Sequence, residues 1–177
     1  MKDKIRIGCG AGFSGDRIEP AIILVNEGRV DYLVLECLAE RTIALAQKRK
    51  MADPEKGYDP LLEKRIESLL PLLKENNTRL ITNMGAANPV AAAKKIIEIA
   101  KAKGIKIKVA AVTGDDVLEE IQKQSDQLKD LENGKSLNTY SIISANAYMG
   151  AEGILAALKT GAQIIITGRV ADPSLFL

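Results

Sequence analysis

The segment RLITNMGAANPVAAAKKIIEIAKAKG, residues 79–104, contains the unit from which the fold can be predicted. It begins with a short apolar run at 79–83, which is typical of a strand buried on both faces. A polar loop follows, and Pro89 then begins a segment of helical period that Gly104 ends. A strand followed directly by such a helix indicates a crossover between parallel strands.

The same unit recurs along the chain. Short β-branched runs predict strands at 4–9, 32–36, 79–83, 107–113, 140–146 and 163–167. A helix is predicted over 60–76, although Pro71 should kink it or end it early. We therefore expect a single domain over residues 1–177, with a three-layer α/β/α architecture around a mainly parallel, Rossmann-like sheet. A (β/α) barrel is the alternative.

Composition narrows the possible partners. The 177 residues are 46% hydrophobic, which suits one domain with a sizeable core. Lys and Arg number 25 against 23 acidic residues, and the net charge of +2 is not gathered in blocks, so neither nucleic acid nor an anionic membrane is an expected partner. No apolar run approaches the ~18 residues of a membrane span and no signal peptide is visible, so we expect a cytoplasmic protein.

The residue types present also limit the chemistry. Histidine is absent, and the two cysteines form no zinc-type cluster, so no metal site is predicted. Acid–base work would fall to Asp, Glu, Lys, Arg or Cys. We interpret Cys9 and Cys37 as small buried hydrophobic residues, because no histidine is available to activate either thiol.

Polar and glycine-rich loops follow the predicted strands at their carboxyl ends. They read GCGAGFSGDR, ECLAER, TNMGAANP, TGDD, NAYMGAE and TGRVADPS. In a parallel sheet or a barrel these ends lie at one edge, where ligands bind. Any one loop can also be explained by turn and capping residues, but six together favour a ligand site at this edge.

The first loop has the spacing of a dinucleotide-binding motif. Gly10, Gly12 and Gly15 follow a predicted strand, and Glu36 stands where an acidic residue would bind ribose. Pro20, however, belongs in the first turn of a helix, which places the helix start beyond the glycines. The loop therefore favours another ligand, and a nucleotide is the weaker alternative.

Candidate site residues are those at the predicted edge that carry suitable chemistry. Carboxylates can act as general acids or bases when burial or a like charge raises their pKa; the candidates are Asp16, Glu36 and Asp172. An arginine can bind a carboxylate or a phosphate with two parallel hydrogen bonds. The candidate ligand-binding residues are Gly10, Gly12, Ser14, Gly15, Arg17, Asn83, Gly85, Asn88, Asn146 and Arg169. Asp115 and Asp116 are interpreted instead as the cap and first turn of a helix.

Several long blocks carry a family resemblance. GCGAGFSGDRIEPA, DYLVLECLAERTIALAQ, GYDPLLEKR, TNMGAANPVAAA, VTGDDV, NAYMGAEGI and TGRVADPSLFL resemble the N-terminal core of the acyclic terpene utilisation (AtuA-type) family, in the expected order and over essentially the whole chain. Members resemble one another beyond GRVADPSLFL, so the chain is expected to be the core of a longer protein. The family's association with breakdown of citronellol- and geraniol-type compounds implies an acyl-CoA or branched-acid substrate.

Three functions remain open from the sequence. The first is an enzyme of branched acyl-CoA or carboxylate catabolism, of hydratase, lyase or hydrolase type, with its ligand at the carboxyl ends of the strands. The second is a dinucleotide- or nucleotide-binding protein, and the third a non-catalytic subunit or scaffold. The expected partners are a small-molecule acid or thioester, with acyl-CoA as a substrate rather than a resident cofactor. A homo-oligomer or a complex with a partner subunit is also expected.

Overall fold

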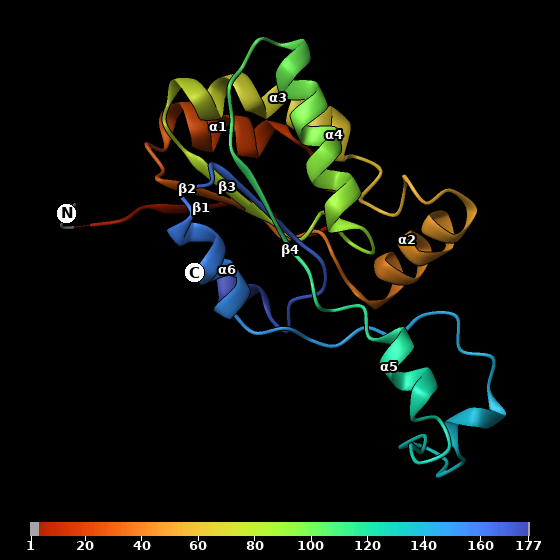
Figure 1. Ribbon diagram of the computed structural model, residues 1–177. Helices are drawn as coiled ribbons and strands as arrows, with labels where there is room; N and C mark the ends of the chain where they lie inside the picture. Colours follow the sequence, from red (N-terminus) through yellow and green to blue (C-terminus); the bar gives the residue numbers. More distant parts are fainter. Residues whose placement is uncertain (1–3, 177) are drawn as a thin grey trace.

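The computed structural model describes residues 4–176 and contains one sheet of five parallel strands (Figure 1). The strands lie in the order β1-β2-β3-β5-β4, with β1 and β4 at the edges. Their bounds are Ile7–Ala11 for β1, Tyr32–Leu35 for β2, Arg79–Thr82 for β3, Val109–Val112 for β4 and Ile164–Thr167 for β5. All four pairings are parallel, which confirms the predicted α/β class.

Helices cover both faces of the sheet and confirm the three-layer architecture (Figure 1). One face carries α1 (Glu19–Glu27), α3 (Leu62–Glu75) and α4 (Pro89–Ala102). The other carries α6 (Glu152–Lys159), while α2 (Glu40–Ala52) and α5 (Leu118–Lys123) lie beyond the end of the sheet. None of the helices within residues 4–176 is long and apolar enough to cross a membrane.

Alternate strand residues supply two separate cores. Leu33 and Leu35 of β2 face the larger helical layer and pack with the buried side of α3, whereas Val34 between them faces α6 and Phe176. This alternation follows from the two-residue period of a strand. Because both faces are covered, the strands read as continuous apolar runs.

The order of the strands creates a switch point between β3 and β5. The chain moves in one direction from β1 to β2 to β3, and then reverses from β4 to β5. The loop after β3 leads to α4 on one face, whereas the chain after β5 packs Val170 and Phe176 on the opposite face. Loops that part to opposite faces leave the crevice in which open parallel sheets bind ligands.

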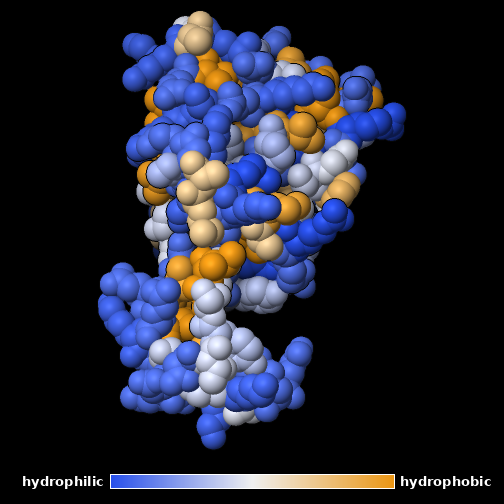
Figure 2. Space-filling model, turned by 90° about the vertical axis from the view of Figure 1, so that its right-hand side faces the viewer, coloured by the Kyte–Doolittle hydropathy of each residue, from blue (hydrophilic) through white to orange (hydrophobic). Residues whose placement is uncertain are grey.

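The segment 140–146 is not a strand, so that prediction is wrong. It belongs to an excursion, residues 113–150, in which every residue from 116 to 150 is at least partly exposed. The segment makes a single antiparallel bridge, between Asn146 and Asp116, because no strand lies beside it to complete a ladder. Figure 2 shows the excursion as a lower lobe joined to the body by a narrow waist.

Pro71 neither ends nor visibly interrupts α3, which continues to Glu75, so the predicted early end is also wrong. Pro71 is exposed, as is Glu67, whose carbonyl loses its hydrogen bond. Leu69, Leu70 and Leu73 are buried on the opposite side. Burial of each contributes about 2 kcal/mol, which together exceeds the ~3 kcal/mol cost of an interior proline.

The start of α1 agrees with the sequence. The helix begins at Glu19 and places Pro20 in its first turn, beyond the glycines of the first loop. A Cβ on Gly10 would lie 2.7 Å from Ala21 Cβ and 2.9 Å from Leu35 Cδ2. Gly10 is therefore required for the close packing of β1 against α1 and β2.

Candidate functional site

The backbone of Leu38, with its N–H and its carbonyl, joins candidate residues at the carboxyl edge. The Leu38 N–H donates to Glu36 Oε1 at 3.1 Å, and the Leu38 carbonyl accepts from Arg169 Nη1 at 3.3 Å. Asn83 Nδ2 donates to the same Glu36 oxygen at 2.7 Å. Glu36, Asn83 and Arg169 follow β2, β3 and β5, so these three neighbouring strands contribute to one hydrogen-bonded group beside the switch point.

Asn83 fixes the position of Glu36. It is buried, and its Oδ1 accepts from the Cys37 N–H at 2.7 Å while its Nδ2 holds Glu36. Glu36 is half-buried, and no hydrogen bond from residues 4–176 reaches its second oxygen, Oε2. A carboxylate with one oxygen held and the other open is arranged as a general base requires.

A buried arginine that the sequence analysis missed ties the first loop to β2. Arg65 of α3 is 2% exposed, and its Nη2 donates to the carbonyls of Ser14 at 2.9 Å and Asp16 at 2.8 Å. Its Nη1 lies 2.9 Å from Cys37 Sγ. The signal in the sequence was a charged residue on the apolar face of a helical segment, three residues after Leu62.

Cys37 holds a neutral thiol. Burial raises its pKa to about 12, although the nearby Arg65 guanidinium acts in the opposite direction. The thiolate is the nucleophilic form of cysteine, so this side chain is unsuited to covalent catalysis. Cys9, in contrast, is exposed rather than buried, which corrects the expectation that both cysteines pack inside.

The first glycine loop borders an open depression of about 420 Å³. Its lining is Cys9, Gly10, Ala11, Gly12, Gly15, Asp16, Arg17 and Pro20. Asp16 Oδ2 accepts the N–H groups of Gly12 at 2.9 Å and Phe13 at 3.0 Å. The loop's own carboxylate thus occupies two amides that a phosphate would need.

Strand order also argues against a dinucleotide at this loop. In the dinucleotide-binding fold the first strand lies at the centre of the sheet, beside the switch point. Here β1 is an edge strand, with β2 and β3 between it and the switch point. Gly10, Gly12 and Gly15 therefore have the spacing of the motif, but the strand that precedes them lacks the central position it has in a dinucleotide-binding fold.

Two further candidates connect loops to one another. Ser14 Oγ donates to Asp59 Oδ2 at 2.5 Å, and Asp59 is a second buried charged residue that the sequence analysis missed. Asn88 caps α4 through its side-chain oxygen, and its Nδ2 donates to the carbonyls of Pro54 and Lys56, both at 2.8 Å. Ser14 and Asn88 thus hold the shape of the edge, and their polar side-chain atoms already have protein partners.

Arg169 lies in a group made from three separate segments. Its Nη2 donates to Glu40 Oε1 at 2.9 Å, and the same oxygen accepts from the Tyr148 hydroxyl at 2.7 Å. The Tyr148 ring centroid lies 4.1 Å from the guanidinium carbon. Arg169 Nε is buried and has no hydrogen-bond partner within residues 4–176.

Asp115 belongs to this group and does not cap a helix, so its interpretation as a cap is wrong. It is 3% exposed and accepts from the Arg169 N–H at 2.8 Å and from Asn146 Nδ2 at 3.1 Å. The left-handed Gly114, with φ of 122°, turns the chain before α5 begins at Leu118. Burial raises the pKa of Asp115.

The remaining polar contacts place Asn146 and Asp116. Asn146 Oδ1 accepts from Gln47 Nε2 at 3.4 Å, so Asn146 reaches the edge although it does not follow a strand. Asp116 forms an ion pair with Lys50 at 3.0 Å, and its Oδ1 accepts from the Leu118 N–H at 3.4 Å. With the Glu40–Tyr148 hydrogen bond, α2 therefore contacts the excursion through three polar pairs.

Asp172 and Gly85 lie outside the hydrogen-bonded groups described above. Asp172 is exposed, and its Oδ1 accepts from the Ser174 N–H at 2.8 Å, so the structure does not join it to the other candidates. A Cβ on Gly85 would lie 2.5 Å from the Thr167 carbonyl oxygen. Gly85 thus permits the close approach of the β3 and β5 loops.

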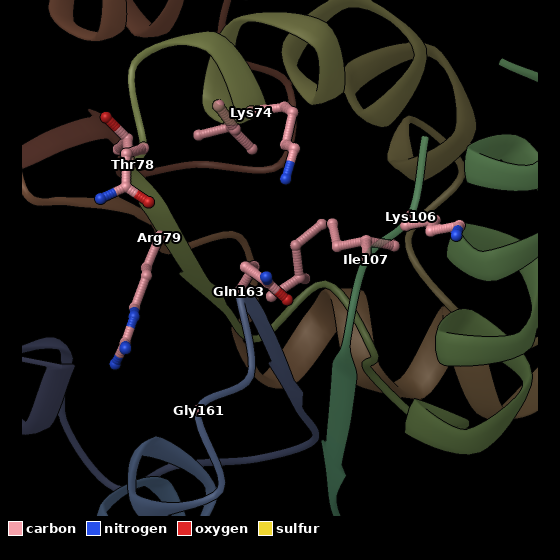
Figure 3. Close-up of a pocket in the computed structure, with 10 residues that line it drawn as sticks. Lys74, Thr78, Arg79, Lys106, Ile107, Gly161 and Gln163 are labelled. Carbon is pink, nitrogen blue, oxygen red and sulfur yellow. The ribbon is translucent and has the colours of Figure 1, made fainter. Parts of the chain in front are cut away.

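A second cavity lies at the opposite edge of the sheet. It measures about 110 Å³ and is bordered by Lys74, Arg79 and Lys106 near the amino ends of β3, β4 and β5. Although this cavity is the better enclosed, Arg79 and Lys106 point in opposite directions (Figure 3). We place the candidate site at the carboxyl edge, where polar side chains converge on one another. Within residues 4–176, no three His, Cys, Asp or Glu side chains come close enough to hold a metal ion.

Together these features define an α/β protein whose polar groups gather beside the switch point of a parallel sheet. A family model described as acyclic terpene utilisation family protein AtuA matches residues 5–177. The chain therefore belongs to the acyclic terpene utilisation family. No curated protein and no solved structure matched the chain.

Proposed function

We propose that this protein is an enzyme of acyclic terpene catabolism that acts on a branched acyl-CoA thioester or its free acid. The observation that carries the proposal is the group in which Glu36, Asn83 and Arg169 are linked through Leu38. It combines a carboxylate with an open oxygen and an arginine with an unused donor. Such a pair suits proton transfer next to an anchored carboxylate or phosphate.

The residues take different roles in this proposal. Glu36 is the general base, and Asn83 holds its Oε1 so that Oε2 faces the substrate. Arg169 anchors the acid group. Asp16 and Arg17 border the depression beside β1, where a longer part of the substrate binds. Hydration, elimination and hydrolysis are reactions that one carboxylate base can support, so we propose a hydratase, lyase or hydrolase.

A ligand screen by thermal unfolding tests the binding part of the proposal. Branched acyl-CoAs and their free acids are expected to raise the melting temperature, since a ligand at about 100 times its Kd stabilises the fold by about 2.7 kcal/mol. A shift with nicotinamide nucleotides alone would contradict the proposal in favour of nucleotide binding. No shift with any ligand would favour the scaffold alternative.

Proton exchange tests the catalytic part without knowledge of the product. An acyl-CoA incubated with the protein in heavy water is expected to gain deuterium at the carbon from which Glu36 removes a proton, as followed by mass spectrometry. The Glu36→Gln variant should bind the thioester and lose the exchange. Equal exchange in the variant and the natural protein would exclude Glu36 as the base.

We also propose that the protein self-associates or joins a partner subunit in the cytoplasm. Support comes from the edge strand β1, whose first residue Ile7 is 38% exposed and is preceded by Ile5, which is 62% exposed. An unpaired strand edge with exposed apolar side chains favours association. Light scattering coupled to size chromatography measures the mass, and a monomer at all concentrations would contradict self-association.

A further inference from the structure

Two donors from distant parts of the chain converge on one exposed carboxylate oxygen. Arg169 Nη2 and the Tyr148 hydroxyl both bind Glu40 Oε1, at 2.9 and 2.7 Å. The Arg169 side chain is 10% exposed, whereas the Glu40 side chain is 73% exposed. The cationic donor is thus held by the protein, while the acceptor lies on the solvent side at the first residue of α2.

The donor edge of Arg169 is only half used. In a guanidinium, Nε and Nη2 point the same way and bind the two oxygens of a carboxylate through parallel hydrogen bonds. Glu40 fills the Nη2 position. Arg169 Nε is the one buried side-chain nitrogen or oxygen within residues 4–176 that has no partner. Buried donors are normally satisfied, so this exception indicates a missing acceptor.

Glu40 is a poor match for the whole site because one of its oxygens takes both hydrogen bonds. Its carboxylate is also tethered to α2, which limits how it can approach the guanidinium. A free carboxylate has no such tether and can place one oxygen on Nε and the other on Nη2. The Tyr148 ring, stacked 4.1 Å from the guanidinium carbon, keeps the donor edge in one plane.

We propose that Arg169 and Tyr148 form a binding site for a small monocarboxylate, and that Glu40 occupies this site in the free protein until the ligand displaces it. The proposal rests on the proposed function for the class of ligand, a free branched acid. It adds a site that Glu40 masks and two residues, Tyr148 and Glu40, that determine its affinity. One arginine cation matches the single negative charge of such an acid.

The contacts of Glu40 make it an effective competitor. The Tyr148 hydrogen bond and, to a smaller extent, Arg169 hold the pKa of its carboxyl below the usual value, so it stays ionised at neutral pH. Arg169 does not depend on Glu40 for its place, because its backbone N–H is bound by Asp115 and its Nη1 by Leu38. Removal of the Glu40 charge therefore leaves the donors in position.

Titration with 3-methylbutanoate, followed by calorimetry on the full chain, tests the inference. The Glu40→Gln variant is expected to bind about tenfold more tightly than the natural protein if Glu40 fills the site for about nine tenths of the time. Glu119→Gln is the matched control, because Glu119 is also an exposed acid in the first turn of a helix and pairs with Lys123 instead. Its affinity should equal that of the natural protein.

The donors are tested in the Glu40→Gln background. Tyr148→Phe keeps the ring and removes the hydroxyl, so it should weaken binding severalfold with no change in melting temperature. Arg169→Lys should weaken binding further, because lysine lacks the two-pronged edge. Inorganic phosphate is the comparison ligand in a parallel titration. Phosphate is expected to bind more weakly than the carboxylate.

Four results would overturn the inference. They are equal affinity with and without Glu40, no loss in Tyr148→Phe or Arg169→Lys, tighter binding of phosphate than of carboxylate, and no binding to any variant. Failure of the proposed function is distinguishable. If Glu40→Gln tightens carboxylate binding but the protein catalyses no proton exchange in heavy water, the masked binding site is supported and the proposed enzymatic function is contradicted. If proton exchange occurs but does not change in the Glu40 and Tyr148 variants, the enzymatic function is supported and the masked binding site is contradicted.

Discussion

Arg65 and Arg169 are both buried at the carboxyl edge of the sheet, yet they are satisfied to different degrees. Arg65 binds the carbonyls of Ser14 and Asp16 at 2.9 and 2.8 Å and contacts Cys37. Arg169 binds one carbonyl at 3.3 Å and one exposed carboxylate, and its Nε has no partner within residues 4–176. Arg65 therefore holds the fold with its donors in use, whereas Arg169 keeps one buried donor unused.

The surroundings of the two arginines differ in the same way. Around Arg65 the first loop is closed on itself, because Asp16 accepts the loop's own amides. Around Arg169 the contacts come from the loop that precedes α2, from α2 and from the excursion, and the residues that meet are up to 131 apart in the sequence. The Arg65 region is therefore the rigid part of the edge, and the Arg169 region is the part that can adapt.

The largest expected effect separates the two arginines directly. Arg65→Leu should lower the free energy of unfolding by about 3 kcal/mol, because two carbonyls lose hydrogen bonds from a charged donor. Arg169→Leu should cost only about 1 kcal/mol, since its ion pair is with an exposed partner. Urea unfolding of both variants measures the difference. Equal losses would remove the distinction between the two regions.

A pair of glycine variants tests how rigid the Arg65 region is. Gly10→Ala should cost about 2 kcal/mol, because its Cβ would overlap Ala21 and Leu35 in a packed core. Gly12→Ala is the control, since a Cβ there meets nothing within 4 Å. Thermal unfolding of both variants checks the prediction. A tolerant Gly10 position would show that β1 can move away from α1.

The smallest expected effect is a pH dependence in the Arg169 region. Burial raises the folded-state pKa of Asp115, so its neutral form is favoured in the fold. The contribution of Asp115 to stability is therefore full below its ordinary pKa and is lost as the pH rises through the raised value. Unfolding of the natural protein and of Asp115→Asn between about pH 3 and about pH 7 should show the natural protein losing stability relative to the variant. A constant difference would contradict this.

Much of the fold could be predicted from local patterns. Five of the predicted strands exist, with bounds shifted by a few residues, and α4 ends at Ala102, two residues before the Gly104 that was predicted to end it. The segment 140–146 has the composition of a strand, but a strand also needs a neighbour, and sequence pattern does not supply one. Pro71 shows the same limit, because buried leucines on the far side of α3 outweigh its local cost.

The sequence was sufficient to predict which edge of the sheet carries the candidate site, but it was not sufficient to predict most of the contacts between the site residues. Glu36, Asn83 and Arg169 were identified because each follows a strand. Arg65 was visible as a charge on an apolar helix face, but its spacing does not reveal which loop it binds. Glu40 and Arg169 are 129 residues apart, so no local signal could pair them.

The excursion has a consequence for how relatives of this chain can diverge. It leaves the sheet after β4 and returns at α6, which packs on β4 and β5, so both its ends lie at neighbouring strands. Doubling the length of such a loop costs only about 0.6 kcal/mol of closure entropy. Insertions and deletions within 117–145 are therefore tolerated thermodynamically, whereas a change near Asp115 or Tyr148 disturbs Arg169. A change in the length of this lobe therefore leaves the sheet and the contacts at its carboxyl edge unchanged.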